Sequence, residues 1–279
     1  MFSRELEVAS ALARQAGEIL LEIYASDFAV DFKGKSDPVT EADRRVNAFL
    51  VDRLRAEFPQ DGIVAEESAD HSDAQHKARC WFVDPLDGTK EFIAKNGEFS
   101  CMIGLSIDGA SRLGVVYQPQ KDKLYRGVVG GGAALEVGGE AGELSVSAVA
   151  DPAALKLVVS RSHRSADINR IVAGLGIREE RPSGSVGLKV GHIAERTADL
   201  YVHVSDRACK WDACGPEAIL RAAGGRFTDL FGEPFDYTEP TIQNARGILA
   251  CNAAAFDAVL PVVSEAAREA GFSAAGDGA

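Results

Sequence analysis

The sequence has few of the features that mark secreted or membrane-bound proteins. Its five cysteines are scattered, and no two of them form a CxxC pair. We therefore expect reduced thiols in a cytosolic protein. No apolar stretch is long enough to cross a bilayer, and Glu5, Glu7 and Glu18 interrupt the apolar residues near the N-terminus. An amphipathic helix is expected there, not a signal peptide.

Positive charge is also scarce. The chain has 30 lysines and arginines against 42 aspartates and glutamates, a net charge of −12. An acidic surface repels the phosphates of DNA, RNA and anionic lipids, so neither a nucleic-acid polymer nor a membrane is expected as a partner. A small phosphorylated ligand stays possible, because bound cations can invert the local electric field.

The 279 residues have an ordinary globular composition, with no internal repeat and no long linker. We predict a single α/β domain with two lobes. Residues 1–148 are expected to form an α+β lobe that carries the metal site, and residues 149–272 an α/β lobe on the substrate side, followed by a flexible tail at 273–279. Helices are expected at 3–25, from 40 onward, and at 90–95, 166–174, 185–197, 212–223 and 253–271. Thr40 is a good N-cap for the second of these, and Asp43 three residues later resembles a capping box. Strands are expected at 63–65, 80–83, 99–107, 112–117, 124–129, 133–137, 155–159, 199–204 and 225–228, and within 244–251. A short strand or hairpin is expected at 29–38 with its turn at 33–37, and Asp108-Gly109 is a hairpin signal between the strands at 99–107 and 112–117.

The stretch 81–89 (WFVDPLDGT) carries the most informative pattern. A buried strand end is followed by two carboxylates three residues apart. Pro85 fixes its own φ and favours an extended conformation at Asp84. We expect a turn that presents Asp84, the Leu86 carbonyl and Asp87 to one point, and such oxygen donors are typical of a Mg²⁺ or Mn²⁺ site.

Other residues extend this pattern. Gly88 and Thr89 open a helix whose free N–H groups can bind an anion. Glu66 ends a predicted strand, and Asp212 begins a predicted helix. Each acid also has an ordinary explanation: a solvated side chain for Glu66, a helix N-cap for Asp212, and an Asx turn for the 84–87 stretch.

Four short motifs together favour the functional interpretation. The chain resembles the inositol monophosphatase superfamily of metal-dependent, lithium-sensitive phosphatases along most of its length, from Lys35 to Cys251. The resemblance implies the layered αβαβα sandwich that this superfamily shares with fructose-1,6-bisphosphatases. The matching motifs, in order, are residues 37–43 (DPVTEAD), 65–68 (AEES), 84–89 (DPLDGT) and 211–215 (WDACG).

The resemblance implies two Mg²⁺ ions. One would be held by Glu66, Asp84 and the Leu86 carbonyl, and the other by Asp84, Asp87 and Asp212. A third ion near Glu66 and Glu67 is possible, Mn²⁺ could replace Mg²⁺, and Li⁺ is expected to inhibit. In a two-metal site one ion lowers the pKa of the attacking water, and the pair neutralises charge on the phosphoryl group.

Thr89 and Asp43 would orient that water and take its proton. No covalent intermediate is expected, because haloacid-dehalogenase-type phosphatases use Asp-x-Asp with a nucleophilic first aspartate, whereas this chain has Asp-x-x-Asp.

The residues around these motifs resemble the 3′(2′),5′-bisphosphate nucleotidase branch. A substrate with two phosphates needs a seat for the phosphate that is not cleaved, and Ser185 at a helix start with Lys189 one turn later could supply it. His163 could contact a base, although Lys189 and His163 can equally be a solvated lysine and a loop histidine. The role of His203 stays open. The branch-like segments are 84–93, 96–99, 159–163, 184–189 and 209–217. The residues expected to contact substrate are Lys35, Gly88, Thr89, His163, Ser185, Lys189 and Asp212.

The first functional hypothesis is hydrolysis of adenosine 3′,5′-bisphosphate to AMP and phosphate, with a role in sulfur assimilation and activity on the sulfated relative of that nucleotide. The second is a broad inositol or sugar monophosphatase. The third, a catalytically silent metal- or nucleotide-binding protein, is disfavoured because every matched position is filled. Either a monomer or a homodimer fits the sequence.

Overall fold

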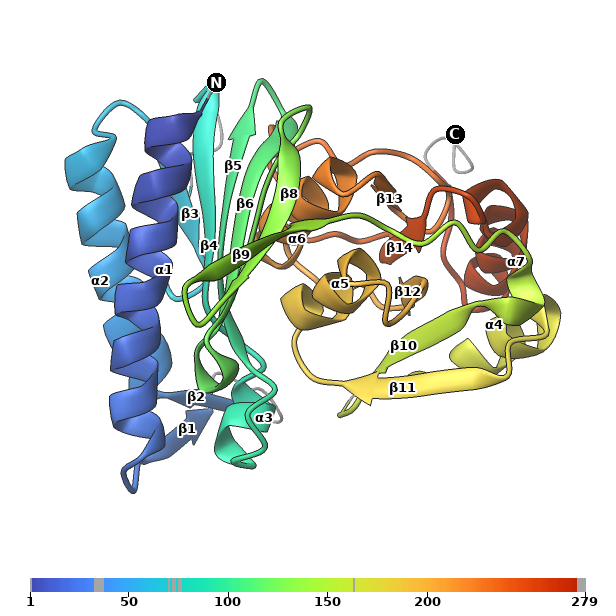
Figure 1. The fold of residues 1–279 in the computed structure, drawn as a ribbon, viewed down its shortest axis with the longest axis horizontal. Helices are drawn as coiled ribbons and strands as arrows, with labels where there is room; N and C mark the ends of the chain where they lie inside the picture. The colour runs from blue at the N-terminus through green and yellow to red at the C-terminus, as the bar shows by residue number, and fades with distance from the viewer. Residues whose placement is uncertain are drawn as a thin grey trace.

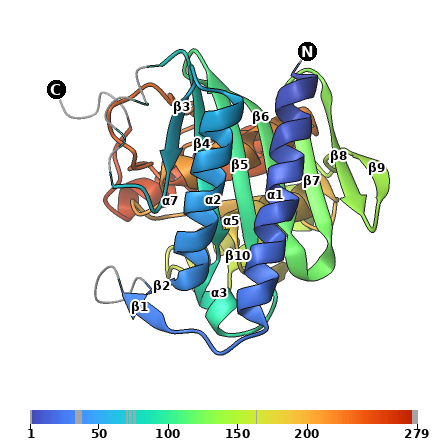
Figure 2. The same ribbon diagram turned by 90° about the vertical axis from the view of Figure 1, so that its left-hand side faces the viewer.

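The computed structural model stacks the elements of the chain in five layers, αβαβα (Figure 1). Two helices, α1 (Ser3–Tyr24) and α2 (Glu41–Glu57), cover the outer face of a seven-stranded sheet, as Figure 2 shows face-on. The helices α5 (Val186–Ala194) and α6 (Lys210–Ala222) lie between this sheet and a five-stranded one. The outer face of the second sheet is covered by α4 (Ile168–Leu175) and α7 (Phe256–Glu269). The predicted sandwich is confirmed. The structure describes residues 2–32, 38–69, 71, 74, 77–162 and 164–274.

The first sheet has the strand order β3-β4-β5-β6-β7-β8-β9. Only β3 and β4 run parallel, and the other neighbours are antiparallel. The sequence did not predict β9, because its glutamates and glycine give no apolar alternation and four of its five residues are exposed at the sheet edge. The strands are β3 (Gly62–Ala65), β4 (Arg79–Asp87), β5 (Ser100–Ile107), β6 (Ala110–Gln118), β7 (Lys123–Val128), β8 (Gly132–Val137) and β9 (Glu140–Leu144).

The second sheet has the order β11-β10-β12-β14-β13. The apolar strand β10 lies between two parallel neighbours, as a strand covered on both faces should. Its neighbour β11 was not predicted from the sequence, because it is a polar edge strand that contains Pro182, and proline within a sheet is confined to edge strands, strand starts and bulges. The strands are β10 (Lys156–Ser160), β11 (Glu179–Ser183), β12 (Leu200–His203), β13 (Gly225–Thr228) and β14 (Ile248–Asn252).

The remaining elements are short. Strands β1 (Val30–Phe32) and β2 (Pro38–Thr40) form an antiparallel pair, and the predicted turn between them lies outside the described residues. A five-residue helix, α3 (Thr89–Ile93), follows β4, and there are single 3₁₀ turns at Pro119–Lys121 and Pro152–Ala154. In the described part of the chain, no helix combines the length and apolarity needed to cross a bilayer.

The segment predicted as a turn after residue 83 is part of strand β4, which continues to Asp87. Asp84 pairs with Met102 and Asp87 with Ser100, so three steps along β4 oppose two along β5. This extra residue is a β-bulge, which accommodates Pro85 and its missing N–H without ending the strand. Because a bulge re-aims side chains, it can turn neighbouring carboxylates toward the same side.

Helix α6 is pressed closely against the seven-stranded sheet. A Cβ added at Gly104 of β5 would lie 2.5 Å from the backbone nitrogen of Gly215. Only glycine permits so close an approach of a helix backbone to a strand. The start of α6, and with it Asp212, is thereby fixed at a set distance from β4.

Candidate active site

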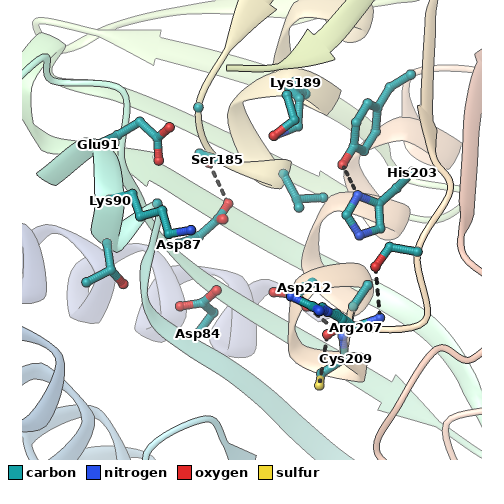
Figure 3. Close-up of a pocket in the computed structure, with 18 of the residues that line it drawn as sticks. Asp84, Asp87, Lys90, Glu91, Ser185, Lys189, His203, Arg207, Cys209 and Asp212 are labelled. Atoms are coloured by element: carbon teal, nitrogen blue, oxygen red, sulfur yellow. Dashed lines mark hydrogen bonds between the residues drawn. The ribbon is translucent and has the colours of Figure 1, made fainter. Parts of the chain in front are cut away.

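A cavity of about 1060 Å³ lies where the β4–α3 segment faces the second sheet and the starts of α5 and α6 (Figure 3). It collects nearly all of the predicted site residues that the structure describes. Lys35 and His163 lie outside the described residues. Those that line the cavity are Glu66, Asp84, Leu86, Asp87, Gly88, Thr89, Ser185, Lys189 and Asp212.

Asp43 stands behind the cavity wall and reaches it through Thr89. Its Oδ2 accepts the backbone N–H and the hydroxyl of Thr40, each at 2.7 Å, which completes the capping box that the sequence predicts at the start of α2. The Thr89 hydroxyl lies 3.1 Å from Asp43 Oδ1 and 3.2 Å from the Leu86 carbonyl oxygen. Burial raises the pKa of Asp43, and the hydrogen bonds from Thr40 and Thr89 partly oppose this. A buried carboxylate is thus held against a hydroxyl that faces the cavity.

Asp84 is 2% exposed and lies at the centre of the acidic wall. Its Oδ1 accepts the N–H of Leu86 at 2.9 Å, so the Asx-type contact that the sequence allows does form, inside the bulge. Burial raises the pKa of Asp84 well above its usual range, and the charges of Glu66, Asp87 and Asp212 raise it further. The conformation that forms the Asp84–Leu86 hydrogen bond is therefore the same one that places Asp84 among the other acidic side chains.

Asp87 is tied to the start of α5. Its Oδ2 accepts the hydroxyl of Ser185 and, at 2.9 Å, the N–H of Gly187. Ser185 is the N-cap of α5, accepts the N–H of Leu188 at 3.0 Å, and has φ of 58°, a value that non-glycine residues rarely adopt. These bonds to a strained residue fix Asp87 relative to the second layer of helices.

Lys189 is buried among the carboxylates of this wall. It is 3% exposed, and its Nζ lies 5.1 Å from the centre of the Tyr201 ring. Burial lowers its pKa, while Asp87, Glu91 and Asp212 act in the opposite direction. Lys189 belongs to α5 and lines the cavity, on the same helix that Ser185 begins (Figure 3). Its charge offsets part of the negative charge of the wall.

Asp212 is not the helix N-cap. Helix α6 begins at Lys210 with Cys209 as its N-cap, and Asp212 is the third helical residue, whose Oδ2 accepts the N–H of Cys209 at 2.6 Å. The helix starts earlier than predicted because the Asp212 side chain, which belongs to the helix itself, accepts the otherwise unpaired N–H of the N-cap residue Cys209. Burial raises the pKa of Asp212 well above its usual range, and Asp87 and Glu66 add to the effect.

The donor set fits a hard divalent cation. Asp84, Asp87 and Asp212 each use one carboxylate oxygen on a nearby N–H, while the second oxygen makes no hydrogen bond to any described residue. Buried carboxylates whose negative charges raise one another's pKa are stabilised by a bound cation. No three His, Cys, Asp or Glu side chains of the described ranges already stand together as a ligand cluster.

Some residues of the cavity were missed in the sequence. Glu91 is 5% exposed, accepts a hydrogen bond from the Ser162 hydroxyl, and belongs to a motif in which only its neighbours were singled out. Glu91 lies in α3, a short helix that packs directly after the end of β4, and a charged residue at such a position could have been recognised as a site residue from the sequence. Arg207 lines the opposite side of the cavity, and no pattern in the sequence pointed to it. Tyr201 and Trp211 complete this wall.

Comparison with known sequences decides the family. The model of the family described as "Inositol monophosphatase family" matches residues 2–266. The chain belongs to the inositol monophosphatase family. It is accordingly a phosphatase, in a family that depends on metal ions, generally Mg²⁺. The family resemblance expected from the four motifs is confirmed.

Individual relatives add detail. The 3′(2′),5′-bisphosphate nucleotidase CysQ of Escherichia coli K12 is 36% identical over 236 residues, which covers 84% of this chain and 94% of the relative. A CysQ structure from Bacteroides thetaiotaomicron has a TM-score of 0.77 at 30% identity, covering 91% of this chain and 98% of that one. The IMPase of Thermotoga maritima has a TM-score of 0.80 at 27% identity, covering 95% and 99%. These are the proteins to which this member of the family is similar.

Proposed function

We propose that the protein removes the 3′-phosphate of adenosine 3′,5′-bisphosphate and releases AMP and inorganic phosphate. The observation that carries the proposal is the hydrogen bond between Thr89 and Asp43 at the edge of a cavity walled by Asp84, Asp87 and Asp212. A volume of about 1060 Å³ accommodates a nucleotide. Similarity to the CysQ nucleotidases over most of the chain supports the choice of substrate.

The metal ligands in this proposal are acidic side chains and one carbonyl. Two Mg²⁺ ions would be held by oxygens of Glu66, Asp84, Leu86, Asp87 and Asp212, with room for a third ion near Glu66. When bound, Mg²⁺ would lower the pKa of a water molecule and offset the charge of the phosphoryl group. Mn²⁺ would serve the same hard oxygen donors, and Li⁺ would compete for one site.

Thr89 and Asp43 move the proton. The Thr89 oxygen accepts a proton from the attacking water as its own hydroxyl proton passes to Asp43 Oδ1, 3.1 Å away. The water oxygen forms the new bond to phosphorus, the bond from phosphorus to the 3′-oxygen breaks, and that oxygen leaves with the electron pair and takes up a proton. Asp43 suits this task because burial raises its pKa.

We propose for Ser185 and Lys189 a different part from the one that the sequence suggested. Both line the cavity, but Ser185 donates its hydroxyl to Asp87, and the charge of Lys189 acts on the same carboxylate. We propose that they hold Asp87 in place and balance its charge. The phosphate that is not cleaved then needs another partner.

A broad inositol or sugar monophosphatase is the second candidate, favoured by the structural similarity to the Thermotoga maritima IMPase. A phosphate-release panel with Mg²⁺ separates the two. It compares adenosine 3′,5′-bisphosphate, inositol 1-phosphate, fructose 1,6-bisphosphate and histidinol phosphate. We expect the nucleotide to give the highest kcat/KM, and an equal or higher value for inositol 1-phosphate would favour the second candidate. Asp84→Asn serves as the inactive control, and addition of LiCl is expected to inhibit the wild type.

A further inference from the structure

The cavity is charged unevenly from one end to the other. Its acids gather on the β4–α3 side and at Asp212, where the cleaved phosphate is proposed to lie. Across the cavity from Asp84 and Asp87, Figure 3 places His203 and Arg207. A substrate with a second phosphate would direct that phosphate away from Asp84 and Asp87 and toward this second side, where Figure 3 also shows Asp212. The question is which group there can bind it.

Only some of the cationic side chains in the cavity are available to a ligand. Lys189 is buried beside Asp87, and Lys90 lies on the same side as that carboxylate (Figure 3). Arg164 is held by Glu180 in a two-point pair, with nitrogen–oxygen distances of 3.0 and 3.1 Å. The lysines and arginines that line the cavity, within the described ranges, are Lys90, Arg164, Lys189 and Arg207.

Arg207 differs from the other three residues. Its side chain is exposed to the cavity, and its guanidinium makes no hydrogen bond or ion pair with any residue that the structure describes. A guanidinium presents several N–H donors in a plane and binds phosphate through two of them at once.

The backbone that carries Arg207 is anchored on both sides. Its N–H donates to the Ser205 hydroxyl at 3.2 Å. The next residue, Ala208, is 4% exposed, and its carbonyl accepts the N–H of Asn244 at 2.7 Å. The Asn244 side chain also donates to the Cys209 carbonyl at 2.7 Å. The Arg207 side chain is therefore accessible to a ligand while its backbone is held in place, and a fixed backbone lowers the entropic cost of binding.

At the start of α6, the N–H groups of Cys209 and Lys210 already have acceptors within the protein. The N–H of Cys209 already donates to Asp212 Oδ2, so the helix end is occupied by a carboxylate of its own. We infer that Arg207 binds the phosphate that is not cleaved and is the residue that makes the enzyme prefer bisphosphorylated over monophosphorylated nucleotides. This inference rests on the proposed 3′-phosphatase activity and adds to it the residue that selects the substrate.

The test compares two substrates that differ only in the second phosphate, adenosine 3′,5′-bisphosphate and adenosine 3′-monophosphate. For Arg207→Ala we expect kcat/KM on the bisphosphate to fall by about 10- to 100-fold, mainly through KM, with less than about a threefold change on the monophosphate. Arg207→Lys keeps the positive charge but lacks the planar guanidinium, so its kcat/KM on the bisphosphate should lie between that of the wild type and that of Arg207→Ala. The matched control is Arg164→Ala, which removes an arginine already paired with Glu180 and should leave the ratio unchanged. The melting temperature of each variant checks its folding.

Each other outcome has a distinct meaning. If Arg207→Ala lowers kcat/KM equally on both substrates, or on neither, the inference is overturned while the proposed function stands. If Arg164→Ala loses the preference instead, the second phosphate belongs to Arg164. If the wild-type enzyme releases phosphate from neither nucleotide, the proposed function fails, and the assignment of Arg207 fails with it.

Discussion

Helices α2 and α6 begin with the same type of capping box, but the aspartate in each box has different neighbours. In α2 and in α6 the third helical residue is an aspartate whose Oδ2 accepts the N–H of its N-cap, Thr40 or Cys209, at 2.7 and 2.6 Å. Asp43 accepts two further hydroxyl donors, from Thr40 and Thr89. Asp212 has no such donors and faces other carboxylates instead.

The difference shows that a capping box fixes where a carboxylate lies but not what it does. Surrounded by hydroxyl donors, Asp43 is suited to accept a proton. Surrounded by acids, Asp212 is suited to bind a cation. The role of each follows from its neighbours in space, which are Thr40 and Thr89 for Asp43 and the charged residues Asp87, Glu66 and Lys189 for Asp212.

Asp212→Asn should have the largest effect. The amide oxygen can still accept the N–H of Cys209, so we expect the fold to survive, while Mg²⁺-dependent kcat falls by about 10³-fold or more. Because the change removes one of several mutually repelling charges, the metal-free variant should melt at the same temperature as the wild type or above it. Steady-state kinetics and thermal melts with and without Mg²⁺ measure both. A variant that keeps its activity would contradict the metal role of Asp212.

Asp43→Asn should reduce activity less and leave metal binding intact. We expect kcat to fall by about 10²- to 10³-fold, because an amide nitrogen cannot accept the proton of Thr89. The increase in melting temperature on adding Mg²⁺ should match that of the wild type and should be much reduced in Asp212→Asn. If the two variants lose this increase equally, the two aspartates do not have separate roles.

Thr40→Ala tests whether the capping box tunes the chemistry. The change removes a hydroxyl that caps α2 and donates to Asp43, so we expect a loss of about 1–2 kcal/mol in the free energy of unfolding. The hydrogen bond from Thr40 lowers the pKa of Asp43, and its removal should raise that pKa. Since protonated Asp43 cannot accept a proton, the acid limb of the kcat–pH profile should move to higher pH. Thr40→Ser, which keeps the hydroxyl, is the control, and an unmoved acid limb in Thr40→Ala would separate capping from catalysis.

The sequence predicted local features well where one segment determines them. The capping box at Thr40, the apolar strand β10 and the β5–β6 hairpin at Asp108 and Gly109 all follow from short-range patterns, and all are present. Strand β9 was missed because its pairing with β8, and not its composition, makes it a strand.

Site features that depend on several segments were harder to predict. The motifs named the acids, but nothing in the sequence showed that Ser185 and Lys189 act on Asp87, because that contact joins β4 to α5 across about a hundred residues. The bulge at Asp84 was taken for a turn because proline favours both. Arg207 had no signal at all, since its importance lies in having no acidic partner among the described residues, a fact that only the folded structure reveals.

Cys209→Ala should have the smallest effect. The backbone N–H of residue 209 donates to Asp212 at the start of α6, and alanine retains this bond; the thiol, a weak hydrogen-bonding group, accepts the backbone N–H of Asp212 and donates to the Arg207 carbonyl at 3.8 Å. We expect a change of less than about 0.5 kcal/mol in the free energy of unfolding, measured by urea titration, and little change in kcat. Thr40→Ala, measured in the same way, provides the contrast. A loss at Cys209 as large as that at Thr40 would mean that the thiol supports α6 as the hydroxyl supports α2, and the two helix starts would then be equivalent.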